Sequence, residues 1–262
     1  MRNQPVKPII GIIGGAGPYA GLDLVRKIFD QTVARTDQEH LSVALLSLPS
    51  AIPDRTQYLL GREEENPADA IADVALQLER MGARVAAIPC NTAHAEAIFE
   101  PVLRKLRAAQ SGLQMVHLIR ETVGFLQAAY PGRQRIGVLS TTGTYRMGLY
   151  VCPLEAAGYR VIVPTTDVQD EIVHQAIYHE EVGIKSQSNP VNRLARHWLE
   201  KAIQALQQDG AEVIILGCTE LPLAVPELSL YGIPMIDPTV VLARSLIREV
   251  APNQLKPLVR AA

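Results

Sequence analysis

The sequence predicts an α/β protein in which two pseudo-symmetric units, each a mainly parallel sheet flanked by helices, face each other across a cleft. Three observations predict this fold class. Short apolar runs alternate with amphipathic helical segments along the whole chain, which is typical of parallel sheets with helices on both faces. The order of elements restarts near residue 135. The stretch "VAAIPCNTAH" (85–94) also has a counterpart in "VIILGCTEL" (213–221), each an apolar run followed by a cysteine.

The first unit opens with the apolar run "PIIGII" and the glycine-rich turn "GGAGP". Apolar runs of strand length then alternate with helical periodicity. Asn66 as a cap, Pro67 at a first helical position and Gly82 near the end mark one helix clearly. The predicted strands cover residues 8–13, 41–48, 84–89 and 114–119, and the predicted helices cover 19–34, 66–83 and 92–108.

The second unit repeats this order after the turn "YPGRQ". Its first strand is followed by "TTGT", which occupies the place of the glycine-rich turn. The predicted strands cover residues 135–140, 160–165, 211–217 and 233–237. The predicted helices run from the "TTGT" turn to about 157, then to 208 with a break near 188–190, and over 220–228 and 239–250.

The spacing of the turns indicates a duplicated unit. Cys90 follows Gly14 by 76 positions, and Cys218 follows Ser140 by 78. In open α/β sheets, ligands bind at the carboxyl ends of the strands, where all four of these turns lie. Two such units facing each other would therefore place two cysteines around one ligand cleft.

Composition excludes several classes of function. The net charge of −2 and the absence of long Lys/Arg runs argue against a nucleic-acid or anionic-membrane partner. The N-terminal stretch lacks a signal-peptide core, and no apolar stretch is long enough to span a membrane, so we expect a cytoplasmic protein. Three cysteines in such a chain predict free thiols rather than a disulfide framework.

The glycine-rich turn allows three interpretations. Gly15, Gly17 and Ala20 match the dinucleotide-binding pattern, but the next predicted strand lacks the expected acidic residue at its end. A tight turn without any ligand is the commonest alternative. Glycines that let backbone amides approach a small anion at a helix N-terminus fit the sequence better.

The two junction cysteines are the main candidates for chemistry. A helix N-terminus favours the thiolate, and both Cys90 and Cys218 are followed by polar residues, which makes simple burial the weaker interpretation. Cys152 lies on an apolar helical face and is predicted to be a core residue. His94 is expected to pack or to form a hydrogen bond, because no further ligands accompany it and a metal site is therefore disfavoured.

Other polar positions are ambiguous by themselves. The "TTGT" turn could bind a carboxylate or could simply cap a helix. Arg55, beside Asp54, and Lys185 would by default be solvated surface charges.

The chain resembles the aspartate/glutamate racemases that work without pyridoxal phosphate, over almost its whole length. The motifs "GIIGGAGP", "IPDRT", "PCNTAH", "TTGT", "GIKS" and "GCTEL" occur in the order found in that family. The resemblance implies that Cys90 and Cys218 are the two catalytic thiols. It assigns substrate binding to Gly15, Arg55, Asn91, Thr92, Thr142, Thr144, Lys185 and Thr219, with Arg55 and Lys185 on the side-chain carboxylate and Asp54 and Glu220 in support. It also implies a homodimer.

The departures from the family pattern favour its aspartate branch. Glutamate racemases carry Asp-Ser at the first loop and His after the second Cys-Thr, where this chain has Gly14-Gly15 and Glu220. We therefore expect a racemase of an acidic amino acid, aspartate favoured, that uses two thiols as acid and base and no cofactor or metal. Glutamate or broader specificity, a related dicarboxylate isomerase or decarboxylase, and a non-catalytic amino-acid sensor remain alternatives. We expect one domain over residues 1–113 with 237–262, and the other over 114–236.

Overall fold

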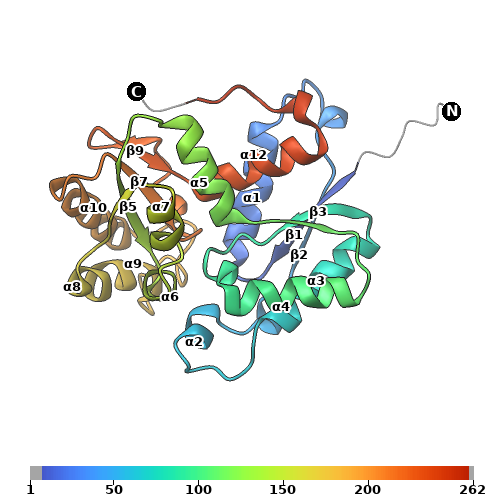
Figure 1. Cartoon of the computed structure of the whole chain (residues 1–262), viewed down its shortest axis with the longest axis horizontal. Helices are drawn as coiled ribbons and strands as arrows, with labels where there is room; N and C mark the ends of the chain where they lie inside the picture. Colours follow the sequence, from blue (N-terminus) through green and yellow to red (C-terminus); the bar gives the residue numbers. More distant parts are fainter. Residues whose placement is uncertain (1–7, 260–262) are drawn as a thin grey trace.

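The computed structural model describes residues 8–259, which form two mainly parallel sheets flanked by helices, as predicted (Figure 1). The first sheet has the order β2-β1-β3-β4, and the second has the order β6-β5-β7-β9-β8. The first contains β1 (Ile9–Gly14), β2 (Val43–Ser47), β3 (Ala83–Ala87) and β4 (Gln114–Val116). The second contains β5 (Arg135–Ser140), β6 (Arg160–Ile162), β7 (Val213–Gly217), β8 (Ser229–Leu230) and β9 (Ile233–Ile236).

The two sheets share one topology. In each, the first strand lies between the second and third strands, and every pairing is parallel except that of β8 with β9. The last residue of β1, Gly14, pairs with Ser47, and the last residue of β5, Ser140, pairs with Gly217. The repeated strand order supports the predicted duplication and places the corresponding turns at corresponding sheet edges.

Helices cover both sheets, and several begin where the sequence provides a cap. Asp54 caps α2 by accepting from the Gln57 amide, and Asp237 caps α12. The helices are α1 (Pro18–Gln31), α2 (Arg55–Leu59), α3 (Ala68–Arg80), α4 (Glu96–Ala108), α5 (Leu118–Ala129), α6 (Thr142–Arg146), α7 (Val151–Ala156), α8 (Thr166–Val168), α9 (His174–Tyr178), α10 (Arg193–Gln208), α11 (Leu221–Ala224) and α12 (Pro238–Val250). Short 3-10 turns include η3 (Thr92–His94), and a π-helical turn, η4 (Gln169–Val173), joins α8 to α9.

Several parts of the predicted secondary structure are wrong. The helix expected from the "TTGT" turn to about residue 157 is divided into α6 and α7. The strand expected over 114–119 ends at residue 116, because buried residues 118, 119, 122, 123 and 126 have helical spacing and form the apolar face of α5. The long helix expected before residue 208 is divided into α8, η4, α9, an irregular segment and α10. The helix expected over 220–228 ends at residue 224, since Pro226 follows closely, and the short strand β8 comes next.

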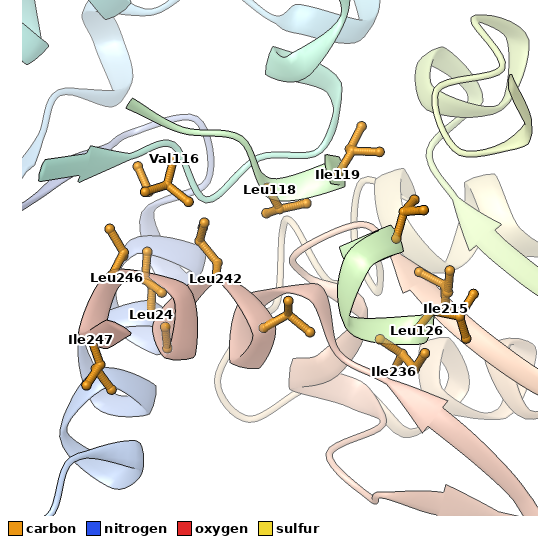
Figure 2. Close-up of a cluster of buried hydrophobic side chains, with 14 of the residues drawn as sticks. Leu24, Val116, Leu118, Ile119, Leu126, Ile215, Ile236, Leu242, Leu246 and Ile247 are labelled. Carbon is orange, nitrogen blue, oxygen red and sulfur yellow. The ribbon is translucent and has the colours of Figure 1, made fainter. Parts of the chain in front are cut away.

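One hydrophobic core joins the two sheets. It contains Ile12 of the first sheet and Ile215 of the second, together with the apolar faces of α1, α5 and α12. Figure 2 shows Leu242 and Leu246 of α12 beside Leu24 of α1. Helix α12 follows the second sheet in the chain but packs against α1 and α5. The domain division into residues 1–113 with 237–262 and residues 114–236 stays a prediction, and β4, at Gln114–Val116, pairs with β3 of the first sheet.

No helix within residues 8–259 is long and apolar enough to cross a membrane.

Candidate active site

The two predicted catalytic cysteines line one cavity between the sheets. Cys90 follows β3 and is 7% exposed, and Cys218 follows β7 and is 3% exposed. Both are free thiols. The cavity, here called the thiol cavity, has a volume of about 10 Å³ and is bounded by polar side chains from both sheets. Its lining residues are Asp54, Arg55, Thr56, Cys90, Asn91, Thr92, Thr141, Tyr178, Lys185, Cys218, Thr219 and Glu220.

The surroundings of Cys218 favour its protonated form. Its Sγ donates to Glu220 Oε2 at 3.0 Å, and Glu220 Oε1 lies 3.0 Å from Lys185 Nζ. Burial raises the pKa of the Cys218 thiol well above its usual value, and the Glu220 carboxylate raises it further, while Lys185 opposes this. Burial acts to raise the pKa of Glu220 as well, but Lys185 and the Cys218 hydrogen bond hold it below its usual value. At neutral pH the structure therefore holds a thiol donating to a carboxylate.

Lys185 belongs to this charged chain. Burial would lower its pKa, but Glu220 and Tyr178 raise it above its usual value. Its ammonium lies 5.5 Å from the centre of the Tyr178 ring. Lys185 is thus a permanent cation whose charge is already matched by Glu220.

The surroundings of Cys90 are dominated by Arg55. Arg55 is 7% exposed, and its guanidinium donates to Pro53 O at 3.0 Å and also donates to Ala16 O. Burial acts to lower the pKa of Arg55, but the charges of Cys90, Asp54 and Glu220 raise it above its usual value. The Nε donor of Arg55 has no partner among the described residues. A fixed cation with a spare donor therefore lies beside one of the two thiols.

The glycine-rich turn forms the wall of an adjoining cavity of about 260 Å³, here called the loop cavity, which shares Arg55, Lys185 and Glu220 with the thiol cavity. Gly15 lines it with φ of 96°, a conformation that favours glycine. A Cβ at Gly17 would overlap Glu220 Oε1. Because these glycines have no side chains, the backbone of the turn can lie close to the charged side chains.

Threonine hydroxyls connect the two halves of the site. Thr92 Oγ1 lies 3.1 Å from Oγ1 of both Thr141 and Thr144, and Thr219 Oγ1 donates to Pro89 O at 3.0 Å. Of the "TTGT" residues, Thr141 lines the thiol cavity, whereas Thr142 and Thr144 are not among its lining residues. Thr142 instead pairs with His174 Nδ1 at 3.1 Å.

Two other predictions have clear outcomes. His94 packs and forms hydrogen bonds, as predicted: its Nδ1 lies 2.8 Å from Cys90 O, and its Nε2 accepts from the Leu118 amide at 3.2 Å. Burial lowers its pKa to about 3, so the ring is neutral. The prediction that Cys152 is a core residue is wrong: it is exposed, since the buried face of α7 is formed by Leu154.

Thr56, Thr141 and Tyr178 also line the thiol cavity and were not predicted. Thr141 is the first residue after β5, so the strand end itself could have indicated it. Thr56 follows Arg55 in α2, and its hydroxyl lies 3.1 Å from the Tyr178 hydroxyl. Tyr178 ends α9, inside the stretch predicted as a long helix, and no sequence signal marked it.

No group of three or more His, Cys, Asp and Glu side chains within 8–259 is arranged to hold a metal ion. The donors that face the two cavities are instead an arginine, a lysine, hydroxyls and an amide, which suit a carboxylate.

Fold and site together define an α/β protein whose polar ligand cavity, with a thiol from each half, lies between two repeated sheets. A model of the Asp/Glu/hydantoin racemase family matches residues 13–246, and the chain belongs to this family. It is therefore an isomerase, an amino-acid racemase, as predicted.

Similar proteins agree with this assignment. The broad specificity amino-acid racemase RacX of Bacillus subtilis is 27% identical over 245 residues, covering 91% of this chain and 96% of the relative. The structure of Picrophilus torridus aspartate racemase superposes with a TM-score of 0.77 at 28% identity, covering 93% of this chain and 94% of that chain. Glutamate racemase from Francisella tularensis, in complex with D-glutamate, has a TM-score of 0.61 at 14% identity and shares the fold.

Proposed function

We propose that the enzyme racemises an acidic amino acid, aspartate before glutamate, by proton transfer between two thiols. The observation that carries this proposal is the thiol cavity, in which Cys90 and Cys218 come from equivalent positions of the two repeated sheets. Racemisation needs a base on one face of the α-carbon and an acid on the other. Two thiols that line one cavity are proposed to lie on opposite faces of the substrate and to supply both, with their roles exchanged for the opposite enantiomer.

The two thiols differ in the proposed resting enzyme. Cys218 donates to an ionised carboxylate and is the acid. Cys90 lines the same cavity as the Arg55 cation and is proposed to act as the base. Proton transfer from substrate to Cys90 and from Cys218 to the opposite face inverts the α-carbon. The enzyme then carries the reversed protonation pattern, which suits the product enantiomer.

The polar donors would hold the substrate carboxylates. Asn91 and Thr92 both line the thiol cavity, and Asn91 Nδ2 is buried without a partner within residues 8–259. Together with Thr219, they are proposed to bind the α-amino and α-carboxylate groups and to stabilise the negative charge that develops on the carboxylate. Thr144 lines neither cavity and is proposed to position Thr92, whose Oγ1 lies 3.1 Å from that of Thr144. Thr142 also lines neither cavity, and its contact with the substrate stays a prediction. Gly15 is proposed as a further substrate contact. Gly15 lies in the loop cavity.

Specificity for an acidic side chain is proposed to come from Arg55. Arg55 lines both the thiol cavity and the loop cavity, and its Nε is buried without a partner among the described residues; the substrate side chain is proposed to lie where the two cavities adjoin. A neutral side chain would leave this buried donor unsatisfied at a cost of about 1 to 3 kcal/mol. Asp54 supports Arg55 by capping α2 and by its charge.

One observation favours a second candidate, a racemase of broader specificity. Lys185 is already paired with Glu220, so its charge is not available in full to a substrate carboxylate. RacX, the Bacillus subtilis relative, is named for broad specificity. With one effective cation instead of two, the penalty for neutral side chains would be smaller.

Racemisation rates for a panel of amino acids distinguish the two candidates. The acidic proposal expects aspartate to exceed alanine and serine by about 5- to 150-fold in kcat/KM, and Arg55→Ala to remove most of that difference. Arg62→Ala, on an exposed arginine after α2, is the matched control. Equal rates for alanine and aspartate in the wild type, or unchanged aspartate kinetics in Arg55→Ala, would refute the carboxylate contact.

The predicted homodimer is proposed to form through α1. Tyr19, Leu22 and Phe29 are 42%, 55% and 37% exposed and lie along one face of this helix. Arg26 lies on the same face and pairs with Asp30 at 3.1 Å. If α1 of a second copy packed antiparallel to this helix, the exposed apolar residues of the two copies would contact each other. Arg26 of each copy would then face the Asp30 carboxylate of the other. Leu22→Asp is expected to yield monomers in sedimentation velocity. Met81→Asp, at another exposed apolar site, is the control and is expected to stay dimeric. A dimeric Leu22→Asp would show that α1 does not form the dimer interface.

A further inference from the structure

Tyr150 contacts the loops of both cysteines. It is 1% exposed and lies just before α7. Its hydroxyl donates to Asn91 Oδ1 at 2.6 Å, and its ring packs so closely on Gly217 that a Cβ there would lie 3.0 Å from Cε2. Asn91 directly follows Cys90, and Gly217 directly precedes Cys218. One buried side chain from the second half of the chain therefore spans the two loops.

The hydrogen bond from Tyr150 determines which end of the Asn91 amide faces the cavity. Asn91 is 2% exposed, and its side chain does not cap the following 3-10 turn. Because the hydroxyl donates to Oδ1, the amide places its Nδ2 donors on the other side, where they have no partner among the described residues. Burial raises the pKa of Tyr150 above its usual value, so the hydroxyl remains a donor throughout the working pH range.

We propose that Tyr150 is a positioning residue for the racemase reaction, which locks the Asn91 amide with its N–H donors toward the substrate carboxylate. This inference rests on the proposed function, in which Asn91 binds that carboxylate. Without the hydroxyl, the amide gains a second orientation, with Oδ1 toward the cavity. An amide oxygen there would repel a carboxylate instead of binding it. Tyr150 itself touches neither the substrate nor the reacting atoms.

A double-mutant cycle tests the proposal. Tyr150→Phe removes only the hydroxyl and is expected to lower kcat/KM about tenfold for both enantiomers, the value of one buried hydrogen bond. Asn91→Ala is expected to lower it at least as far. Adding Tyr150→Phe to Asn91→Ala should then cause no further loss, because there is no amide left to orient. Tyr159→Phe, on a half-buried tyrosine of the same half, is the matched control.

Additive losses in the cycle, or an unchanged kcat/KM in Tyr150→Phe, would overturn the proposal. Thermal unfolding of each variant shows whether a loss of activity only follows a loss of fold. Asn91→Asp provides a second test, because the new side chain still accepts from Tyr150 but offers no N–H donor. This variant is expected to be as impaired as Asn91→Ala. A fully active Asn91→Asp would overturn the role of the amide donor. Failure of the proposed function is recognised separately, by a wild-type enzyme that racemises no acidic amino acid.

Discussion

Glu220 is predicted to keep Cys218 protonated, and Glu220→Gln tests this. The substitution keeps the shape of the side chain and removes a negative charge whose Oε2 lies 3.0 Å from Cys218 Sγ. Two unit charges about 4 Å apart, at an effective dielectric constant of about 20, repel each other by about 4 kcal/mol. Glu220 is 4% exposed, so solvent screens this repulsion little. Its loss would favour the thiolate of Cys218 by up to about a thousandfold, and the unpaired Lys185 acts in the same direction.

The assay follows the ultraviolet absorbance of the thiolate against pH. A Cys90→Ser, Cys152→Ser background leaves Cys218 as the only cysteine of the chain. In this background, Glu220→Gln should shift the titration of Cys218 to markedly lower pH. Glu200→Gln, which removes one of the two acidic partners of Arg196 in α10, is the control and should not shift it. An unchanged or higher titration midpoint in Glu220→Gln would refute the electrostatic reasoning.

Three further predictions concern His94, Gly17 and the cysteines. Folding holds the pKa of His94 at about 3, below the ordinary value of 6.5, so the unfolded chain binds the extra proton and stability falls as the pH drops through this window. Between pH 7 and pH 5, the free energy of unfolding measured in urea should fall by about 2 kcal/mol more in the wild type than in His94→Gln. The same pH dependence in both proteins would contradict this prediction. Gly17→Ala should displace the Glu220 carboxylate and lower kcat, while the melting temperature changes little. Wild-type kinetics in this variant would show that the turn does not fix the position of the Glu220 carboxylate. Alanine at either cavity cysteine should lower turnover by at least about a hundredfold, whereas exposed Cys152→Ala should retain it, and a wild-type rate in Cys90→Ala would be incompatible with the mechanism.

The repeated strands and the thiol positions could be predicted because they depend on local patterns. Apolar runs and turn residues mark β1, β3, β5 and β7, and parallel strands bring their carboxyl ends to one edge. The convergence of Cys90 and Cys218 on one cavity follows from that topology.

The features that could not be predicted depend on tertiary contacts. The pairing of Lys185 with Glu220 joins residues 35 positions apart, from an irregular segment and from a turn after β7. The choice of Thr141 over Thr142 as a lining residue depends on where β5 ends, which periodicity does not determine to a single residue. Cys152 is exposed because it lies off the face of α7 that Leu154 buries, and which face of a short helix is buried depends on what packs against it. The packing of Tyr150 between two loops has no local signal at all.

The central claim, a base on one face of the substrate and an acid on the other, is tested most directly by racemisation in deuterium oxide. With two thiols, the proton removed by one is not the proton delivered by the other, so each turnover should place solvent deuterium at the α-carbon of the product enantiomer. Early in the reaction, mass spectrometry of separated L- and D-aspartate should find deuterium in the product and almost none in the remaining substrate, whichever enantiomer is supplied. Deuterium appearing equally in both enantiomers from the start, or a product without deuterium, would contradict the two-thiol account.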